Sequence, residues 1–271
     1  MAERLYEGKE HATAYLKYRV APHELIAKVL GYMEEKTTQP FKLAVDVGCG
    51  SGQGTTLLAP YFTQVVGTDI SPAQLVMAQA NSKPPNVSYR QCPAEELPFA
   101  AGEADLVTAM TAAHWFDRQR FLQEADRVLR PGGGCLALLS YTLDMELEYG
   151  DVSGTLTDIC KEFYAALLPF RSPYLGPSST LIYKDMFDSC PYPDKEWDEC
   201  FRLRRSLPLN GYISMVETFT SYQKLQQKDP AEAERLSHNI RNKLLSAMGA
   251  SSPDTEVVVV VKYFYWLARK P

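Results

Sequence analysis

The stretch VDVGCGSGQG, residues 45–54, decides the fold of this 271-residue chain. A short apolar run, FKLAVDV at residues 41–47, leads directly into four glycines, at positions 48, 50, 52 and 54. Because fixing glycines costs a chain much backbone freedom, such a density indicates a turn that a ligand approaches closely. The pattern therefore predicts a buried strand that is closed by a ligand-binding turn.

Further apolar runs predict more strands along the next hundred residues. These strands are expected at residues 64–70, 86–92, 103–110 and 135–140. A helix is expected after Ser71, with Ser71 as its N-cap and Pro72 at its first position, and another over residues 121–130, ended by Pro131 and three glycines. Five strands with intervening helices predict an α/β fold with a doubly wound, mostly parallel sheet, whose ligands bind at the carboxyl ends of the strands.

The pattern changes after Ser140. Residues 144–225 are interpreted as a substrate-side cap inserted after the fifth strand, with a helix at residues 156–170 and a possible sixth strand at residues 196–205. A further helix is predicted from Asp229 to Gly249, and five consecutive valines predict a buried C-terminal strand within residues 255–269. We interpret residues 1–271 as a single domain whose core, about residues 42–140, binds the cofactor.

The bulk composition argues against several classes of protein. The net charge is −5, from 28 basic and 33 acidic residues, without a clustered basic stripe, which disfavours a nucleic-acid partner. The longest apolar run, residues 257–268, is too short to span a bilayer. The start of the chain carries no apolar signal core, and its six cysteines are scattered without metal-ligand spacing. We expect a cytoplasmic protein without a membrane or metal partner, and a monomer or a weak dimer.

The glycine turn does not have the sequence pattern of a phosphate-binding site. A dinucleotide fingerprint starting at Gly48 would need its third glycine at position 53, which is Gln53. Asp46 stands two residues before the turn, and a carboxylate there would repel a pyrophosphate by roughly 1–4 kcal/mol. The same carboxylate would attract a cationic, phosphate-free nucleoside. An NAD-dependent oxidoreductase remains the rival interpretation.

Asp69 supports the nucleoside interpretation. It ends the second predicted strand, 21 residues after Gly48, where an acidic side chain accepts two hydrogen bonds from a ribose diol. The alternative is that Asp69 is an N-terminal acid of the helix that follows.

These residues resemble the class I S-adenosylmethionine-dependent methyltransferases, which have a Rossmann-like fold. The similarity covers about residues 42–140 and includes VDVGCGSG, Asp69 and LRPGG at residues 129–133. It implies a cofactor site formed by Asp46, Gly48, Cys49, Gly50, Ser51, Gly52, Asp69, Ile70, Ala94, Glu95, Met110, Thr111 and His114. Ile70 would pack on the adenine. CPAEELPF, residues 92–99, resembles the adenine-side loop, but Pro93 replaces the usual acid, so the backbone near Ala94, or Glu95, would have to substitute.

Other stretches resemble the trans-aconitate methyltransferase type: TAAHWFD at residues 111–117, AYLKYR at residues 14–19 and the segment 209–225. This resemblance places Tyr18 and Arg19 over the methionine part of the cofactor. Trp115 would line the substrate pocket. His114 is the candidate catalytic residue, with an ordinary structural histidine as the alternative.

Methyl transfer from a sulfonium is an in-line displacement, and a carboxylate acceptor is already ionised at neutral pH, so no base is required. Arg202 and Arg204 could bind such an acceptor, unless they form an exposed basic edge. We predict an S-adenosylmethionine-dependent methyltransferase that acts on a small carboxylic acid and leaves S-adenosylhomocysteine. Two alternatives are another small-molecule oxygen or nitrogen acceptor, with His114 or a tyrosine as base, and a cofactor-binding protein without turnover, which Pro93 would suit.

Overall fold

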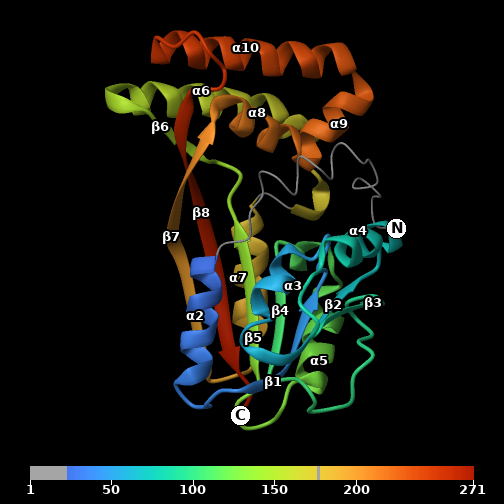
Figure 1. The fold of residues 1–271 in the computed structure, drawn as a ribbon. Helices are drawn as coiled ribbons and strands as arrows, with labels where there is room; N and C mark the ends of the chain where they lie inside the picture. The colour runs from blue at the N-terminus through green and yellow to red at the C-terminus, as the bar shows by residue number, and fades with distance from the viewer. Residues whose placement is uncertain (1–22, 176–177) are drawn as a thin grey trace. The chain divides into compact units, whose positions relative to one another are not determined.

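The computed structural model describes residues 23–175 and 178–271, which form two compact units. The sheet unit contains residues 23–140, 178–199 and 264–271 among those described. The helical unit contains residues 141–175 and 200–263. Figure 1 labels the elements of both units.

The described residues form a sheet of eight strands in the order β3-β2-β1-β4-β5-β8-β6, with β7 also paired to β8. The strands are β1 (Phe41–Val47), β2 (Phe62–Asp69), β3 (Val87–Gln91), β4 (Leu106–Met110), β5 (Cys135–Tyr141), β6 (Glu146–Glu148), β7 (Asp194–Pro208) and β8 (Glu256–Arg269). Strands β1 to β5 pair in parallel, whereas β6 pairs antiparallel to β8. The predicted doubly wound α/β sheet is confirmed, and the strand order reverses at β1, where such sheets bind their ligands.

Helices cover both faces of the sheet in the sheet unit. They are α2 (His23–Glu34), α3 (Gln53–Leu58), α4 (Pro72–Asn81), α5 (Arg118–Val128) and α7 (Ser179–Ser189). Because side chains alternate along a strand, Val45 and Val47 share one core with α5 and α7, whereas Asp46 points to the opposite face and contacts α3. The predicted N-cap of α4 is confirmed, since Ser71 Oγ accepts the Gln74 N–H at 3.4 Å.

Helix α7 lies in the stretch that the sequence analysis interpreted as cap. Its residues Ile182, Tyr183 and Met186 are buried in the core of the sheet unit. The second half of β7 and the first half of β8, residues 200–208 and 256–263, belong to the helical unit, so both strands continue from one unit to the other.

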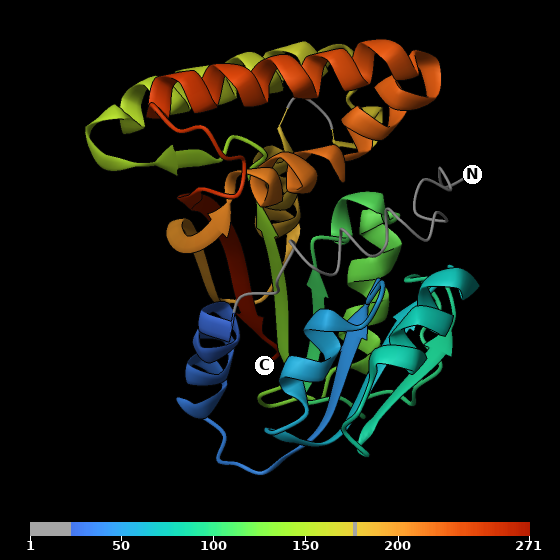
Figure 2. The ribbon, with the colours of Figure 1, turned by 45° about the horizontal axis from the view of Figure 1, so that its top comes forward.

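The helical unit contains α6 (Ser153–Leu167), α8 (Leu209–Glu217), α9 (Thr220–Lys228) and α10 (Pro230–Met248). Figures 1 and 2 show α10 lying along α6. The expected ends of α10 are confirmed, because Asp229 accepts the Glu232 N–H at 3.0 Å and Gly249 is left-handed with a φ of 61°. The helix expected at residues 156–170 is α6 followed by a 3₁₀ turn at Leu168–Phe170.

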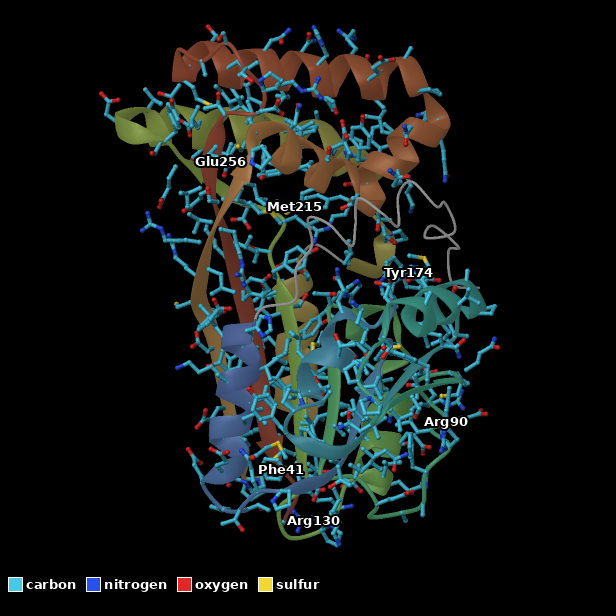
Figure 3. All side chains as sticks on the ribbon, in the orientation of Figure 1. Phe41, Arg90, Arg130, Tyr174, Met215 and Glu256 are labelled. Carbon is cyan, nitrogen blue, oxygen red and sulfur yellow. The ribbon has the colours of Figure 1, made fainter. Side chains whose placement is uncertain are left out.

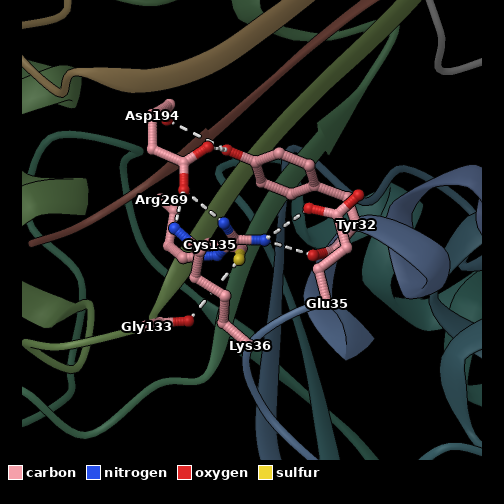
Figure 4. Close-up of polar contacts among 7 residues, drawn as sticks. All are labelled: Tyr32, Glu35, Lys36, Gly133, Cys135, Asp194 and Arg269. Atoms are coloured by element: carbon pink, nitrogen blue, oxygen red, sulfur yellow. Dashed lines mark hydrogen bonds and ion pairs between the residues drawn. The ribbon is translucent and has the colours of Figure 1, made fainter.

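A polar cluster in the sheet unit joins three distant segments of the chain, α2, β7 and β8 (Figure 4). Tyr32 donates to Asp194 Oδ1 at 2.8 Å, and Lys36 Nζ lies 3.0 Å from Asp194 Oδ2. The Arg269 guanidinium, whose side chain is 5% exposed, also pairs with Asp194 and lies over the Tyr32 ring at 4.2 Å. A buried charge is tolerated only when it is paired, so this cluster holds α2 against the two strands.

In the described part of the chain, we find no helix with both the length and the apolar character needed to cross a bilayer.

Candidate functional site

The turn after β1 is packed at its two ends and open at its centre. Gly48, Gly50 and Gly52 have positive φ angles of 68°, 53° and 82°. A Cβ on Gly48 would lie 2.6 Å from the Cβ of Ala112, and one on Gly52 would lie 2.3 Å from the Tyr89 hydroxyl oxygen. A Cβ on Gly50 would have Gln74 Oε1 as its nearest neighbour, at 3.7 Å. A ligand can therefore approach the backbone at Gly50, whereas the flanking glycines are required by packing.

Asp46 lies beneath this turn and is 1% exposed. Its Oδ2 accepts a hydrogen bond from Thr55 Oγ1 at 2.6 Å, and its Oδ1 has no hydrogen-bond partner among the described residues. Burial raises the pKa of Asp46 to about 7, and the Asp69 carboxylate adds to this increase. A buried carboxylate oxygen without a donor is costly, and a cationic ligand group would compensate for that cost. The arrangement fits the ammonium or sulfonium of S-adenosylmethionine and disfavours a phosphate.

Asp69 occupies the carboxyl end of β2, as predicted for the residue that binds the ribose. Its Oδ2 accepts the Gly50 N–H at 2.9 Å, and its Oδ1 accepts the Ser71 N–H at 2.8 Å. Each carboxylate oxygen still has capacity for another donor, so both remain able to bind a diol. The contact with Ser71 shows that the alternative role, support of the start of α4, is also present. Ile70 is 60% exposed beside it, which leaves an apolar side chain free to pack on a base.

The loop at residues 92–99 leaves β3 next to Asp69. The Cys92 N–H donates to the Asp69 carbonyl at 3.2 Å, and Ala94 is buried. Glu95 Oε1 accepts the backbone N–H of Asp117 at 2.7 Å. The structure therefore uses one oxygen of Glu95 to join this loop to the start of α5, a contact that the sequence analysis did not foresee.

The turn after β4 brings the other predicted residues to the same end of the sheet. Thr111 has a φ of 60°, a left-handed conformation that costs energy for a residue other than glycine. It is held there while its N–H donates to Leu139 O at 2.7 Å. Phe116 packs against the glycine turn. Its ring is so close that a Cβ added to Gly48 would lie 3.1 Å from it. Strain at a ligand-binding edge is typical of functional turns.

His114 lies in a 3₁₀ turn, Ala113–Trp115, near two aromatic rings. Its ring centroid is 5.0 Å from that of Trp115 and 6.3 Å from that of Tyr183. Tyr183 comes from α7 and is buried, and burial raises its pKa, so its hydroxyl stays protonated at neutral pH. Tyr183 was missed because its segment was interpreted as cap, although Ile182 and Met186 have the spacing of a buried helix face.

Most of the predicted residues belong to the sheet unit. These are Asp46, Gly48, Cys49, Gly50, Ser51, Gly52, Asp69, Ile70, Ala94, Glu95, Met110, Thr111, His114 and Trp115. Tyr18 and Arg19 lie outside the described residues. Thr55, which binds Asp46, and Tyr89, which packs against Gly52, were not predicted.

Arg202 and Arg204 lie on β7 in the helical unit, where their side chains are exposed. Arg202 pairs with Glu146 at 3.3 Å, and Arg204 pairs with Glu148. Both arginines are therefore exposed and ion-paired on this part of β7. A role in substrate binding remains a prediction, and a substrate carboxylate would have to compete with these two glutamates.

Comparison with known proteins indicates a methyltransferase. Residues 45–137 match the family model of the methyltransferase domain. A Dictyostelium discoideum protein named as a methyltransferase is 29% identical over 250 residues, covering 91% of this chain and 88% of that protein. A Saccharomyces cerevisiae protein named as an S-adenosylmethionine-dependent methyltransferase is 24% identical over 253 residues, covering 84% and 86%.

A solved structure, described as a type II methyltransferase from Anaeromyxobacter dehalogenans, superposes with a TM-score of 0.70. It is 24% identical and the match covers 92% of this chain and 97% of that one. The shared architecture extends well beyond the residues that the family model matches.

Proposed function

Because this chain is a class I S-adenosylmethionine-dependent methyltransferase, we propose that it methylates the carboxylate of a small molecule to give a methyl ester. The observation that supports this acceptor is that the two carboxylates next to the turn after β4, those of Asp117 and Glu95, already accept hydrogen bonds from backbone N–H groups. Asp117 accepts the Arg120 N–H at 3.2 Å, and Glu95 accepts the Asp117 N–H at 2.7 Å. Both carboxylates serve the start of α5, which suits an acceptor that needs no base.

The cofactor supplies a methyl group on a sulfonium, so that a carboxylate oxygen can form the new bond while the carbon–sulfur bond breaks toward sulfur. The chain's own contribution is alignment. Asp46 and Asp69 would hold the cationic and ribose parts of the cofactor, and Trp115 would line the substrate side. Correct alignment of two reactants is worth about 7–11 kcal/mol of a barrier, which is enough for catalysis without proton transfer.

Two further observations support a carboxylate. The stretch TAAHWFD at residues 111–117 resembles the trans-aconitate methyltransferase type. A relative from Hahella chejuensis, 36% identical over 41% of this chain, is named as a malonyl-[acyl-carrier protein] O-methyltransferase. Other partial relatives carry names with hydroxyl acceptors, such as the tocopherol O-methyltransferase of Arabidopsis thaliana, so the acceptor must be tested directly.

The test is a methylation assay with isotope-labelled S-adenosylmethionine and a panel of small carboxylic acids, their primary amides, phenols and amines. We expect the labelled methyl group to be transferred only to the carboxylic acids. The product should be a methyl ester, which mild alkali hydrolyses to labelled methanol. At saturating S-adenosylmethionine, the turnover rate should be flat between about pH 6 and 8.5, and His114→Gln should keep activity within about tenfold. An alkali-stable product, together with a loss of about 10²-fold or more in His114→Gln, would identify a base-dependent acceptor instead. Cofactor binding without any product across the panel would contradict the proposal and favour a binding protein.

A further inference from the structure

The loop at residues 92–99 has no regular secondary structure, yet side chains from neighbouring elements bind its backbone. The Leu97 N–H donates to Glu124 Oε1 at 2.7 Å. The carbonyl oxygens of Leu97 and Phe99 accept from Arg127, at 2.9 Å and 2.8 Å. Arg90, labelled on the flank of the unit in Figure 3, donates to the Pro98 carbonyl at 3.0 Å. Surface loops usually leave such groups to water, so this loop is held in one conformation.

Arg127 and Glu124 act as one unit on the same face of α5. Arg127 Nε lies 2.8 Å from Glu124 Oε2, and Nη2 lies 2.6 Å from Oε1, which makes a two-pronged pair. This pairing lowers the pKa of Glu124, so the carboxylate is charged at neutral pH. The planar guanidinium then directs its remaining N–H groups at the two loop carbonyls, a geometry that a lysine cannot reproduce.

The held loop runs from the predicted ribose acid to the turn after β4. At its start, the Cys92 N–H donates a hydrogen bond to the Asp69 carbonyl. In its middle, the Glu95 carboxylate accepts a hydrogen bond from the Asp117 N–H. Pro93 offers no side-chain acceptor where the usual acid would stand. Recognition of the base from this loop is therefore expected from the backbone near Ala94, or from Glu95, in a loop whose conformation is held by side chains of α5.

We propose that Arg127, oriented by Glu124, is a specificity-determining positioning residue, which fixes the conformation of loop 92–99 so that the loop selects adenine. Neither side chain has to touch the cofactor. The inference rests on the cofactor arrangement that underlies the proposed function, but it does not depend on which acceptor is methylated.

The test compares two ligands that differ in the base alone: S-adenosylhomocysteine and S-inosylhomocysteine, which has a 6-oxo group in place of the amino group. Dissociation constants are measured by competition against labelled S-adenosylhomocysteine for the wild-type chain, Arg127→Ala, Arg127→Lys and Glu124→Gln. Arg118→Ala is the matched control, because Arg118 lies on the same helix and is exposed.

We expect Arg127→Ala to raise the Kd of S-adenosylhomocysteine about tenfold or more and that of the inosine analogue less than about threefold. The wild-type preference for adenine over the inosine analogue should therefore be lost in Arg127→Ala, with smaller losses in Arg127→Lys and Glu124→Gln and none in Arg118→Ala. Equal weakening of both ligands, or unchanged Kd values, would overturn the proposal. Thermal unfolding of each variant shows whether it still folds. If Arg127→Ala does not fold, the Kd values of the two ligands for Glu124→Gln test the proposal instead. A failed methylation assay would leave these Kd ratios unaffected, so the two proposals fail separately.

Discussion

Thr55 donates a hydrogen bond of 2.6 Å to one oxygen of Asp46, while the other oxygen of that carboxylate has no partner among the described residues. This contact ties β1 to α3 across the glycine turn. It also leaves a buried, half-satisfied acid at the place where the cofactor's positive charge is expected. Two pH-dependent properties should result.

The first concerns the stability of the chain without cofactor. Burial raises the pKa of Asp46 to about 7, against about 3.9 in an unfolded chain. Between these values the unfolded chain loses its proton first, so Asp46 lowers the free energy of unfolding as pH rises, by at most about 1.4 kcal/mol per unit. Urea unfolding at pH 5 and pH 8 should show this slope in the wild type and a smaller one in Asp46→Asn. The same slope in both would contradict the assignment.

The second concerns proton release on binding. A cationic cofactor favours the ionised form of Asp46, so S-adenosylmethionine should expel a proton from the fraction of molecules that hold one. Titration calorimetry near pH 6.5, in two buffers that differ in ionisation enthalpy, counts those protons. Asp46→Asn should release fewer of them and bind more weakly. Equal proton counts for both chains would argue that Asp46 does not face the cofactor's charge.

Gly52 should not tolerate a side chain. Gly52→Ala would place a Cβ 2.3 Å from the Tyr89 hydroxyl oxygen and add about 1–2 kcal/mol for a left-handed alanine. We expect a lower melting temperature and loss of S-adenosylhomocysteine binding. Adding Tyr89→Phe should relieve part of the clash but not the backbone cost. Wild-type binding by Gly52→Ala would show that this end of the turn is not closely packed.

Asp69→Ala should weaken S-adenosylhomocysteine binding by about tenfold or more, because the diol loses a charged acceptor. The change also removes the bonds from Gly50 and Ser71, so a second measurement is needed. The wild type should bind a 2′,3′-dideoxy analogue weakly, and Asp69→Ala should show little further loss with that analogue. A full tenfold loss with the analogue would mean that Asp69 acts by supporting the turn and not by binding ribose.

The cluster around Arg269 should contribute to stability without affecting the site. Asp194→Ala leaves a guanidinium, 5% exposed, without its main anion, which should cost about 1–3 kcal/mol in urea unfolding. Asp188→Ala is the control, because its exposed pair with Lys184 at 3.1 Å should contribute less than about 0.5 kcal/mol. Similar losses for both variants would show that the cluster is only an ordinary surface network.

Elements that depend on near neighbours were predictable. The strand Phe41–Val47 followed by glycines, the Ser71 cap before Pro72 and the Gly249 end of α10 all follow from local spacing and backbone preferences. Helix α7 was harder, because periodicity tells which face of a helix is buried but not which partner buries it. The segment was therefore interpreted as cap, whereas Tyr183 lies beside His114 in the sheet unit.

The sequence by itself determined the parallel sheet, the turn at its switch point and the positions of Asp46 and Asp69 beside that turn, because short-range patterns and residue types carry that information. Only the tertiary structure decided which polar groups meet. It paired Arg127 with a loop about 30 residues earlier in the chain, Glu95 with Asp117, and Arg202 with Glu146. Such partners are set by how strands and helices pack, and several carboxylates compete for each cation until the fold places one within reach.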